Sequence, residues 1–193
     1  PLLEHWLQTT GEYSESALAG EVQKTGSKLL QQVFDWSGKV NESIDQLPKK
    51  KTKVFTGAKD IISRIYKETD IYIISSANRE AVCREWEEAS LLNYVTECMT
   101  QEKGTKRECL KKVCAFGYEP ANVLMVGDAL GDKESADATE IPFFPILAGK
   151  EESSWQEGRE NAFPAWLNGN YTKEMQQKYE NQFYQNLGRD ERK

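Results

Sequence analysis

The sequence has a single histidine, His5, and its four cysteines form no CxxC pair. A zinc site of the usual Cys/His type is therefore excluded, because it needs several such ligands at short spacings. The lone histidine also argues against a Ser-His-Asp or Cys-His enzyme, since it lies in a stretch expected to be an N-terminal helix. We expect the four cysteines to be reduced thiols of a cytoplasmic protein: Cys83, Cys98, Cys109 and Cys114.

The chain also lacks a long apolar run and an excess of basic residues. No run approaches the roughly 20 apolar residues that span a bilayer, and no signal peptide is visible. Lys and Arg number 25 against 31 Asp and Glu, which gives a net charge of -6 at pH 7. Because nucleic acids and anionic membranes bind basic surfaces, we expect neither as a partner. The 193 residues allow one globular domain with an accessory part.

Three segments differ in their pattern. Residues 1–50 predict a helical, cap-like segment, in which apolar residues such as Leu30 and Val33 recur at spacings of three and four. Residues 51–150 predict an α/β core. Residues 151–193 predict a C-terminal helical extension with breaks at Pro164 and at 168–170, which could pack on the sheet or pair with another subunit. A homo-oligomer is therefore one expectation.

The core segment alternates amphipathic stretches with short apolar runs. Such alternation predicts an α/β fold with a doubly wound parallel sheet. Pro145 cannot donate to a sheet hydrogen bond, so the last strand is expected at an edge. The expected helices are residues 57–67, 78–89, 105–116 and 133–139, and the expected strands are residues 71–74, 94–99, 123–126 and 143–147.

Polar side chains follow three of the expected strands. In a parallel α/β sheet, ligands bind beyond the carboxyl ends of the strands, so these side chains should share one edge. Carboxylates suit Mg²⁺, and hydroxyl, backbone N–H and lysine groups suit phosphate oxygens. The combination predicts a phosphoryl-transfer site. The residues are Ser75 and Ser76, then Lys103 and Lys106, then Asp128 and Asp132.

The strings IISSAN, GTKRECLKK and VLMVGDALGD occur in this order. They resemble the second, third and fourth motifs of the haloacid dehalogenase-like (HAD) hydrolase superfamily, and the resemblance covers about residues 54–148. It implies a Rossmann-like core with a helical cap. It also implies a Mg²⁺-dependent phosphatase acting on a small phosphorylated metabolite.

The resemblance assigns a role to each matching residue. Ser75 would donate a hydrogen bond to the phosphoryl oxygens, with further N–H donors from the backbone at Ser76. Lys106 would neutralise the phosphoryl group. Asp128 would ligate Mg²⁺, and Asp132 would support the water shell of the metal or orient the lysine. Lys103 is an alternative for the same role. Lys106 is favoured over it, because a turn-forming glycine precedes Lys106 and helix-compatible sequence follows it.

The first motif of the family, DxDx[TV] after an apolar strand, carries the nucleophile, and we do not find it in this chain. The nearest string, VFDWSG, has Asp35 in the first position but Ser37 in place of the second acid, and its apolar residues repeat at helical spacing. One explanation is that an upstream segment supplies both the strand and the nucleophile. The start of the sequence at Pro1 agrees with this expectation. Another is a substitute strand over Thr52–Thr56. We expect no phosphatase turnover from residues 1–193 alone.

Less specific interpretations stay open for each residue. Ser75 and Ser76 could cap the following helix, Asp128 could cap the next one, and the lysines could be surface residues. The chain would then be a catalytically inactive HAD-like protein that binds a ligand or partner, or a response-type α/β domain. The five tryptophans are expected to pack in the core or against the cap: Trp6, Trp36, Trp86, Trp155 and Trp166.

Overall fold

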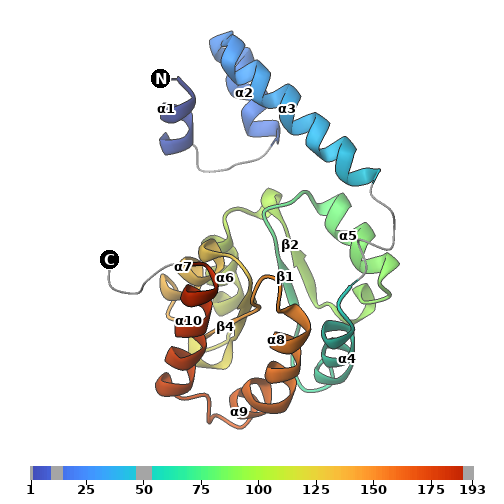
Figure 1. Ribbon diagram of the computed structural model, residues 1–193, viewed down its shortest axis with the longest axis vertical. Coiled ribbons are helices and arrows are strands. Elements are labelled where there is room, and N and C mark those ends of the chain that lie inside the picture. Colours follow the sequence, from blue (N-terminus) through green and yellow to red (C-terminus); the bar gives the residue numbers. More distant parts are fainter. Residues whose placement is uncertain (1, 10–14, 47–53, 189–193) are drawn as a thin grey trace.

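The computed structural model describes residues 2–9, 15–46 and 54–188 (Figure 1). This part of the chain is a mixed α/β structure, mostly helical, with four short parallel strands. The strands are β1 (Tyr72–Ile74), β2 (Glu97–Met99), β3 (Met125–Gly127) and β4 (Phe143–Pro145). The α-helices are α1 (Leu2–Thr9), α2 (Glu15–Thr25), α3 (Lys28–Asp45), α4 (Thr56–Ile65), α5 (Arg79–Glu88), α6 (Lys106–Ala115), α7 (Leu130–Asp137), α8 (Glu151–Glu157), α9 (Phe163–Leu167) and α10 (Lys173–Asn186). Short helical turns are η1 (Leu92–Tyr94), η2 (Gln101–Lys103), η3 (Pro120–Asn122) and η4 (Gly158–Ala162).

The three N-terminal helices form their own group. Helix α3 packs against α2 and also touches α1, and the group lies apart from the α/β part (Figure 1). Leu18 and Leu30 are buried there, as the helical spacing predicts for Leu30. Val40, on the predicted apolar face, is 37% exposed, and Trp36 is 66% exposed. The prediction that Trp36 packs in the protein is therefore wrong, because no described element covers that side of α3.

The strands form two separate pairs rather than one sheet. Strand β1 pairs in parallel with β2, with Ile73 opposite Cys98, and β3 pairs in parallel with β4, with Val126 opposite Phe144. Parallel strands that alternate with helices confirm the α/β class. Within residues 2–9, 15–46 and 54–188, however, nothing connects β1 to β3 by strand hydrogen bonds, so a continuous doubly wound sheet is not formed.

Helix α6 nevertheless lies across both strand pairs. Its Leu110 belongs to a buried cluster with Met125 of β3 and Phe143 of β4, and Ile74 of β1 packs against the same cluster. A second cluster joins Ile61 of α4 to β4 and to the C-terminal helices. Helical packing, not strand pairing, therefore holds the two halves of the core together.

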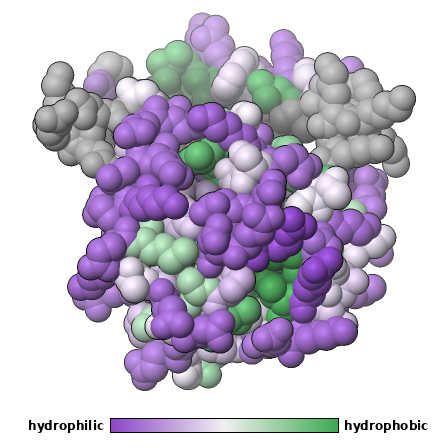
Figure 2. Space-filling view, turned by 60° about the horizontal axis from the view of Figure 1, so that its bottom comes forward, coloured by the Kyte–Doolittle hydropathy of each residue, from purple (hydrophilic) through white to green (hydrophobic). Residues whose placement is uncertain are grey.

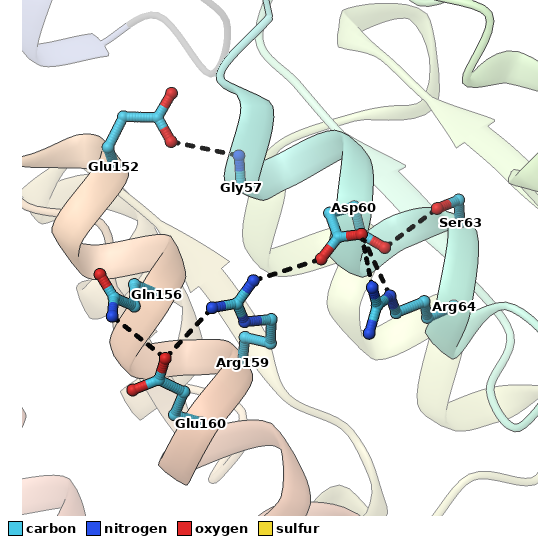
Figure 3. Close-up of polar contacts among 8 residues, drawn as sticks. All are labelled: Gly57, Asp60, Ser63, Arg64, Glu152, Gln156, Arg159 and Glu160. Carbon is cyan, nitrogen blue, oxygen red and sulfur yellow. Dashed lines mark hydrogen bonds and ion pairs between the residues drawn. The ribbon is translucent and has the colours of Figure 1, made fainter.

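The C-terminal helices pack on this core. Helix α8 lies against α4, where the Glu152 carboxylate accepts hydrogen bonds from the backbone N–H groups of Thr56 (3.0 Å) and Gly57 (3.1 Å). Figure 3 shows the hydrogen bond to Gly57. Asp60 of α4 accepts a further hydrogen bond from Arg159 at 3.4 Å (Figure 3). Glu152 thereby satisfies backbone donors that a helix start leaves without partners, and it joins two segments far apart in the sequence.

Helix α10 packs on the outer strand, β4. The Phe183 ring meets the Phe143 ring edge-on, with centroids 5.6 Å apart. Lys133 of α7 is buried and forms ion pairs with Asp137 and with Glu180 of α10. The edge position of β4, expected from Pro145, holds within the described residues, because β4 pairs with β3 alone.

Several predicted boundaries need correction. The strand predicted at 94–99 begins only at Glu97, because Leu92–Tyr94 forms a helical turn. The strand predicted at 123–126 is Met125–Gly127, and the strand predicted at 143–147 ends at Pro145. The helix predicted at 133–139 starts earlier, at Leu130.

Pro164 does not interrupt the C-terminal helices, contrary to the prediction. It occupies the first turn of α9, where its missing N–H costs little, and the chain stays helical from Glu151 to Leu167 through the π-helical turn η4. The break at 168–170 is confirmed. None of the helices in the described part of the chain is long and apolar enough to cross a membrane.

Candidate functional site

The start of α6 is fixed by a capping box. Thr105 accepts a hydrogen bond on its hydroxyl from the Glu108 N–H (3.3 Å), and the Glu108 carboxylate accepts one from the Thr105 N–H (2.8 Å). Gly104 precedes them with a positive φ of 112°, a conformation that favours glycine. Lys106 is therefore the first residue of the helix. This capping box was not among the sequence predictions, although the Thr-x-x-Glu pattern is visible in the sequence.

Lys106 meets Asp132 of α7. Its Nζ lies 2.5 Å from Asp132 Oδ1, and the Ala129 N–H donates to the other carboxylate oxygen at 3.1 Å. Asp132 is only 3% exposed. Gly127 leaves room for this carboxylate, because a Cβ at that position would lie 2.5 Å from Asp132 Oδ2. The Gly-Asp-x-x-x-Asp spacing thus has a steric reason in this structure.

Asp128 differs from Asp132 in both exposure and partners. It follows β3 directly, is exposed and lines a large cavity. No hydrogen bond or ion pair among the described residues engages its carboxylate. Asp128 is therefore free to take a ligand, whereas both oxygens of Asp132 already accept hydrogen bonds.

Ser75 and Ser76 follow β1. The Ser75 N–H donates to the Met99 carbonyl (3.0 Å), and its hydroxyl oxygen accepts from the Ala77 N–H (3.2 Å). Asn78 caps α5 by accepting from the Ala81 N–H at 2.8 Å, so the interpretation of the serines as helix caps is wrong. No hydrogen bond in the described residues joins either serine to the Lys106–Asp132 pair.

Lys103 lies in a different environment from Lys106. It forms an ion pair with Glu97 at the start of β2, and its side chain is 43% exposed, compared with 24% for Lys106. Its carbonyl accepts a hydrogen bond from Lys112 at 2.5 Å. Of the two candidate lysines, the structure brings Lys106 to the predicted acidic pair.

A cavity of about 1480 Å³ separates the two strand pairs. Its lining includes Tyr72–Ile74 of β1, Met125–Gly127 of β3, apolar residues of α4 such as Ile61 and Ile62, and Leu110 of α6. Figure 2 shows apolar side chains gathered in a hollow among hydrophilic ones on the face that it brings forward. We call the space between the two strand pairs the central cavity, and Asp128 is one of six acidic residues that line it.

The nearest match to a nucleophile motif is not part of this site. Asp35 lies on α3, is exposed and accepts a hydrogen bond from Gln31 at 2.8 Å. Its interpretation as a solvated helical residue is confirmed. The substitute strand at Thr52–Thr56 is not seen either, because Thr56 begins α4 and residues 54 and 55 have no strand structure. Residues 52 and 53 lie outside the described residues.

The comparison with known proteins decides the family. The sequence profile of haloacid dehalogenase-like hydrolases matches residues 3–146. The chain belongs to the haloacid dehalogenase-like hydrolase family. The match takes in the N-terminal helices as well as the segments that carry Ser75, Lys106 and Asp128. No curated protein and no solved structure matches the chain.

The metal-binding capacity of this HAD-like chain is limited in its described part. No group of three or more Cys, His, Asp or Glu side chains comes together there. The two acids of the fourth motif are divided between two tasks, since Asp132 binds Lys106 and Asp128 faces the central cavity. Mg²⁺ is compatible with so few protein ligands, because it keeps several waters and also binds substrate phosphate oxygens.

Proposed function

We propose that this chain belongs to a Mg²⁺-dependent phosphatase that acts on a small phosphorylated metabolite. The observation that carries the proposal is the ion pair between half-buried Lys106 and buried Asp132, which follows the exposed Asp128 by four residues. Family membership supports hydrolysis, and this geometry supports a phosphoryl substrate. A cation held by one acid while a second acid stays free is suited to binding an anionic ester together with a metal ion.

Lys106 would bind and neutralise the phosphoryl group. Asp132 accepts a hydrogen bond from its ammonium group and so limits the positions of a long, flexible side chain, which lowers the entropy lost on substrate binding. The Ala129 N–H fixes Asp132 in turn. Lys106 thus acts on the substrate, and Asp132 is a positioning residue.

Asp128 is the residue that would hold Mg²⁺. When bound, the ion would supply positive charge against the phosphoryl oxygens. Its other ligands would be water, substrate oxygens and one protein oxygen from outside the described residues. Ser75, at the end of β1, would donate its hydroxyl hydrogen to a phosphoryl oxygen, because that hydrogen has no acceptor among the described residues.

The nucleophilic aspartate is proposed to lie on a segment upstream of residues 1–193. Asp35 cannot serve, since it is on an exposed helix in the separate N-terminal group. The nucleophile would approach phosphorus between Lys106 and Asp128, and its strand would lie between β1 and β3, in the cavity that Asp128 lines. The helices α1–α3 would act as a cap that limits substrate size, as lids do in other enzymes.

The test uses a strand-extended chain, in which five apolar residues, Asp-Leu-Asp and a short linker precede Pro1. We expect Mg²⁺-dependent release of phosphate from small phosphate esters such as p-nitrophenyl phosphate. The matched control replaces the first added Asp by Asn and should be inactive, because it removes the attacking oxygen. A properly folded strand-extended chain without activity would instead favour the alternative function, a catalytically inactive HAD-like protein that binds a ligand or partner.

A further inference from the structure

Two of the four cysteines meet where helix α5 packs on strand β2 (Figure 1). Cys98 is the middle residue of β2, and its side chain belongs to a buried cluster with Ile73 of β1 and Val82 of α5. Cys83 is the residue of α5 that follows Val82, and it packs against the same cluster. The Cys83 and Cys98 thiols share a hydrogen bond. Two free thiols from different elements are therefore in contact.

A second contact fixes the orientation of α5 on β2. Arg79 lies one helical turn before Cys83, so the two residues are on the same face of α5. The Arg79 guanidinium group donates a hydrogen bond to the Cys98 carbonyl at 2.7 Å. The face of α5 that carries Cys83 is thereby held against β2 at Cys98. A disulfide forms without a large backbone movement only between cysteines that already face each other, as these two do.

The two thiols differ in their access to solvent. Cys98 is 4% exposed, whereas Cys83 is only half-buried. Burial and the neighbouring Cys83 raise the pKa of Cys98 to about 11, so Cys98 keeps its proton at neutral pH. Cys83 is therefore the thiol that meets an oxidant from solution first. Cys98 is too deeply buried for that, but it is placed to react with an oxidised Cys83, as a resolving thiol does.

We propose that Cys83 and Cys98 are a redox pair that forms a reversible disulfide when the chain meets a peroxide. The pair joins the helix that follows the Ser75–Asn78 loop to the strand whose last residue, Met99, accepts the Ser75 N–H. The disulfide would therefore fix this loop from both of its neighbouring elements. The proposal goes beyond the proposed function, because it uses none of the residues assigned to the phosphoryl group or to Mg²⁺.

The chemistry takes two steps. The Cys83 sulfur attacks one oxygen of hydrogen peroxide, the O–O bond breaks, and the products are a sulfenic acid on Cys83 and one water. The Cys98 sulfur then attacks the Cys83 sulfur and displaces its hydroxyl group, which leaves as a second water with the proton of the Cys98 thiol. Both thiols are oxidised to one disulfide, and the peroxide is reduced to water. A dithiol reductant reverses the reaction by thiol–disulfide exchange.

The test treats the reduced 193-residue chain with millimolar hydrogen peroxide and maps its cysteines by mass spectrometry without reduction. We expect a link between the Cys83 and Cys98 peptides within one chain, and dithiothreitol should remove it. Cys109, which is buried in a different cluster, should keep its free thiol and so show that the chain stays folded. The oxidised chain should melt roughly 5 °C or more above the reduced chain, because the link restricts the unfolded state.

Three variants define the roles of the thiols. Cys98→Ala removes the resolving thiol, so dimedone should trap roughly fivefold or more sulfenic acid on Cys83 than in the unmodified chain. Cys83→Ala, at the less buried position, should protect Cys98 from peroxide. Cys114→Ala, on α6, is the matched control and should form the disulfide at an unchanged rate. Circular dichroism checks that each variant is folded.

Three results would overturn the proposal. One is the absence of a Cys83–Cys98 disulfide after peroxide treatment, whether Cys83 stays reduced or accumulates as sulfinic acid. Another is a disulfide from Cys83 to Cys109, to Cys114 or to a second chain, which would show that Cys98 is not its partner. The third is an oxidised chain with an unchanged or lower melting temperature, which would show that the link does not fit the native contact. None of these results depends on phosphatase activity, so the redox pair and the proposed function can fail separately.

Discussion

Lys106 and Asp132 are 26 residues apart in the sequence and are joined by a hydrogen-bonded ion pair of 2.5 Å. Each stands in the first turn of its helix, α6 and α7, which pack against each other. Asp132 is almost fully buried, so this pair is held more rigidly than a surface ion pair. The ammonium group of Lys106 is thereby held at the start of α7, close to where a phosphoryl group is proposed to bind.

The first prediction separates the two candidate lysines. In the strand-extended chain, Lys106→Met should lower kcat at least 100-fold, because it removes a preorganised cation from the transition state. Lys103→Met should change kcat less than threefold, since Lys103 is paired with Glu97. Initial rates with p-nitrophenyl phosphate measure both. The reverse order of effects would show that the wrong lysine has been placed in the site.

The second prediction concerns the two acids. Asp128→Asn should raise the Mg²⁺ concentration for half-maximal activity at least tenfold, because it weakens a metal ligand. Asp132→Asn should mainly lower kcat, because it releases Lys106. Glu134→Gln, an exposed position on the same helix, is the matched control. Metal titrations of the strand-extended chain give both parameters, and an equal shift in the metal requirement for both acid variants would contradict this division of roles.

The third prediction compares two glycines that are four residues apart. Gly127→Ala places a Cβ 2.5 Å from Asp132 Oδ2 and should destabilise the fold by about 1–3 kcal/mol, as overpacking does. Gly131→Ala meets nothing within 4 Å, and in helix α7 it should stabilise by about 0.5–1 kcal/mol. Urea unfolding of the 193-residue chain measures both. Equal effects of the two substitutions would show that the Asp132 side chain is not packed on Gly127.

The fourth prediction concerns pH and the buried Lys133. Burial alone would lower the pKa of Lys133, but its hydrogen bond to Asp137 and the charge of Glu180 outweigh burial and raise the pKa above 10.5. A pKa raised in the folded state gives stability that is fully present below the unfolded pKa and is lost as the pH rises through the folded pKa.

Lys133→Met should therefore destabilise by about 3 kcal/mol at pH 7, because it leaves Glu180 buried without its cation. The loss relative to the unmodified chain should shrink at alkaline pH, as the pH rises through the raised pKa of Lys133. Lys178→Met, whose lysine is 61% exposed, is the control and should have a small effect at both pH values. A loss that is independent of pH would show that the charge of Lys133 does not contribute.

The fifth prediction concerns thiol reactivity. Burial raises the pKa of Cys98 to about 11, with a contribution from Cys83, and burial also raises the pKa of Cys109. Both thiols are buried, so they should react with a disulfide reagent only after unfolding. Cys83 is half-buried and should react faster in the native protein. Mass spectrometry of the labelled chain checks the order, and rapid native labelling of Cys109 would contradict this packing.

The sequence predicted the order of the elements well because periodicity reports local structure. The apolar stretch at 71–74 and the amphipathic stretch at 57–67 were both recognisable from side-chain spacing alone. Boundaries depend on other forces. The strand expected at 94–99 is shorter than predicted, because Leu92–Tyr94 forms a helical turn. Pro164 was expected to interrupt the C-terminal helices but lies in the first turn of α9.

The site could be predicted in part for the same reason. Residues that follow a parallel strand share one edge, and Asp128 and Asp132 do follow β3, with Lys106 in contact with Asp132. A contact between Asp132 and the lysine was one of two expectations for this acid, but the steric fit of Asp132 over Gly127 was not visible in the sequence. The split between the strand pairs is a tertiary property that spacing in the sequence does not show.

The most direct test of the central claim is Mg²⁺-dependent hydrolysis of p-nitrophenyl phosphate by the 193-residue chain and by its strand-extended form, side by side. We predict no turnover above background for the 193-residue chain and clear turnover, abolished by EDTA, for the extended form. Robust Mg²⁺-dependent turnover by the 193-residue chain itself would contradict the claim, because it would mean that a nucleophile is already present within residues 1–193.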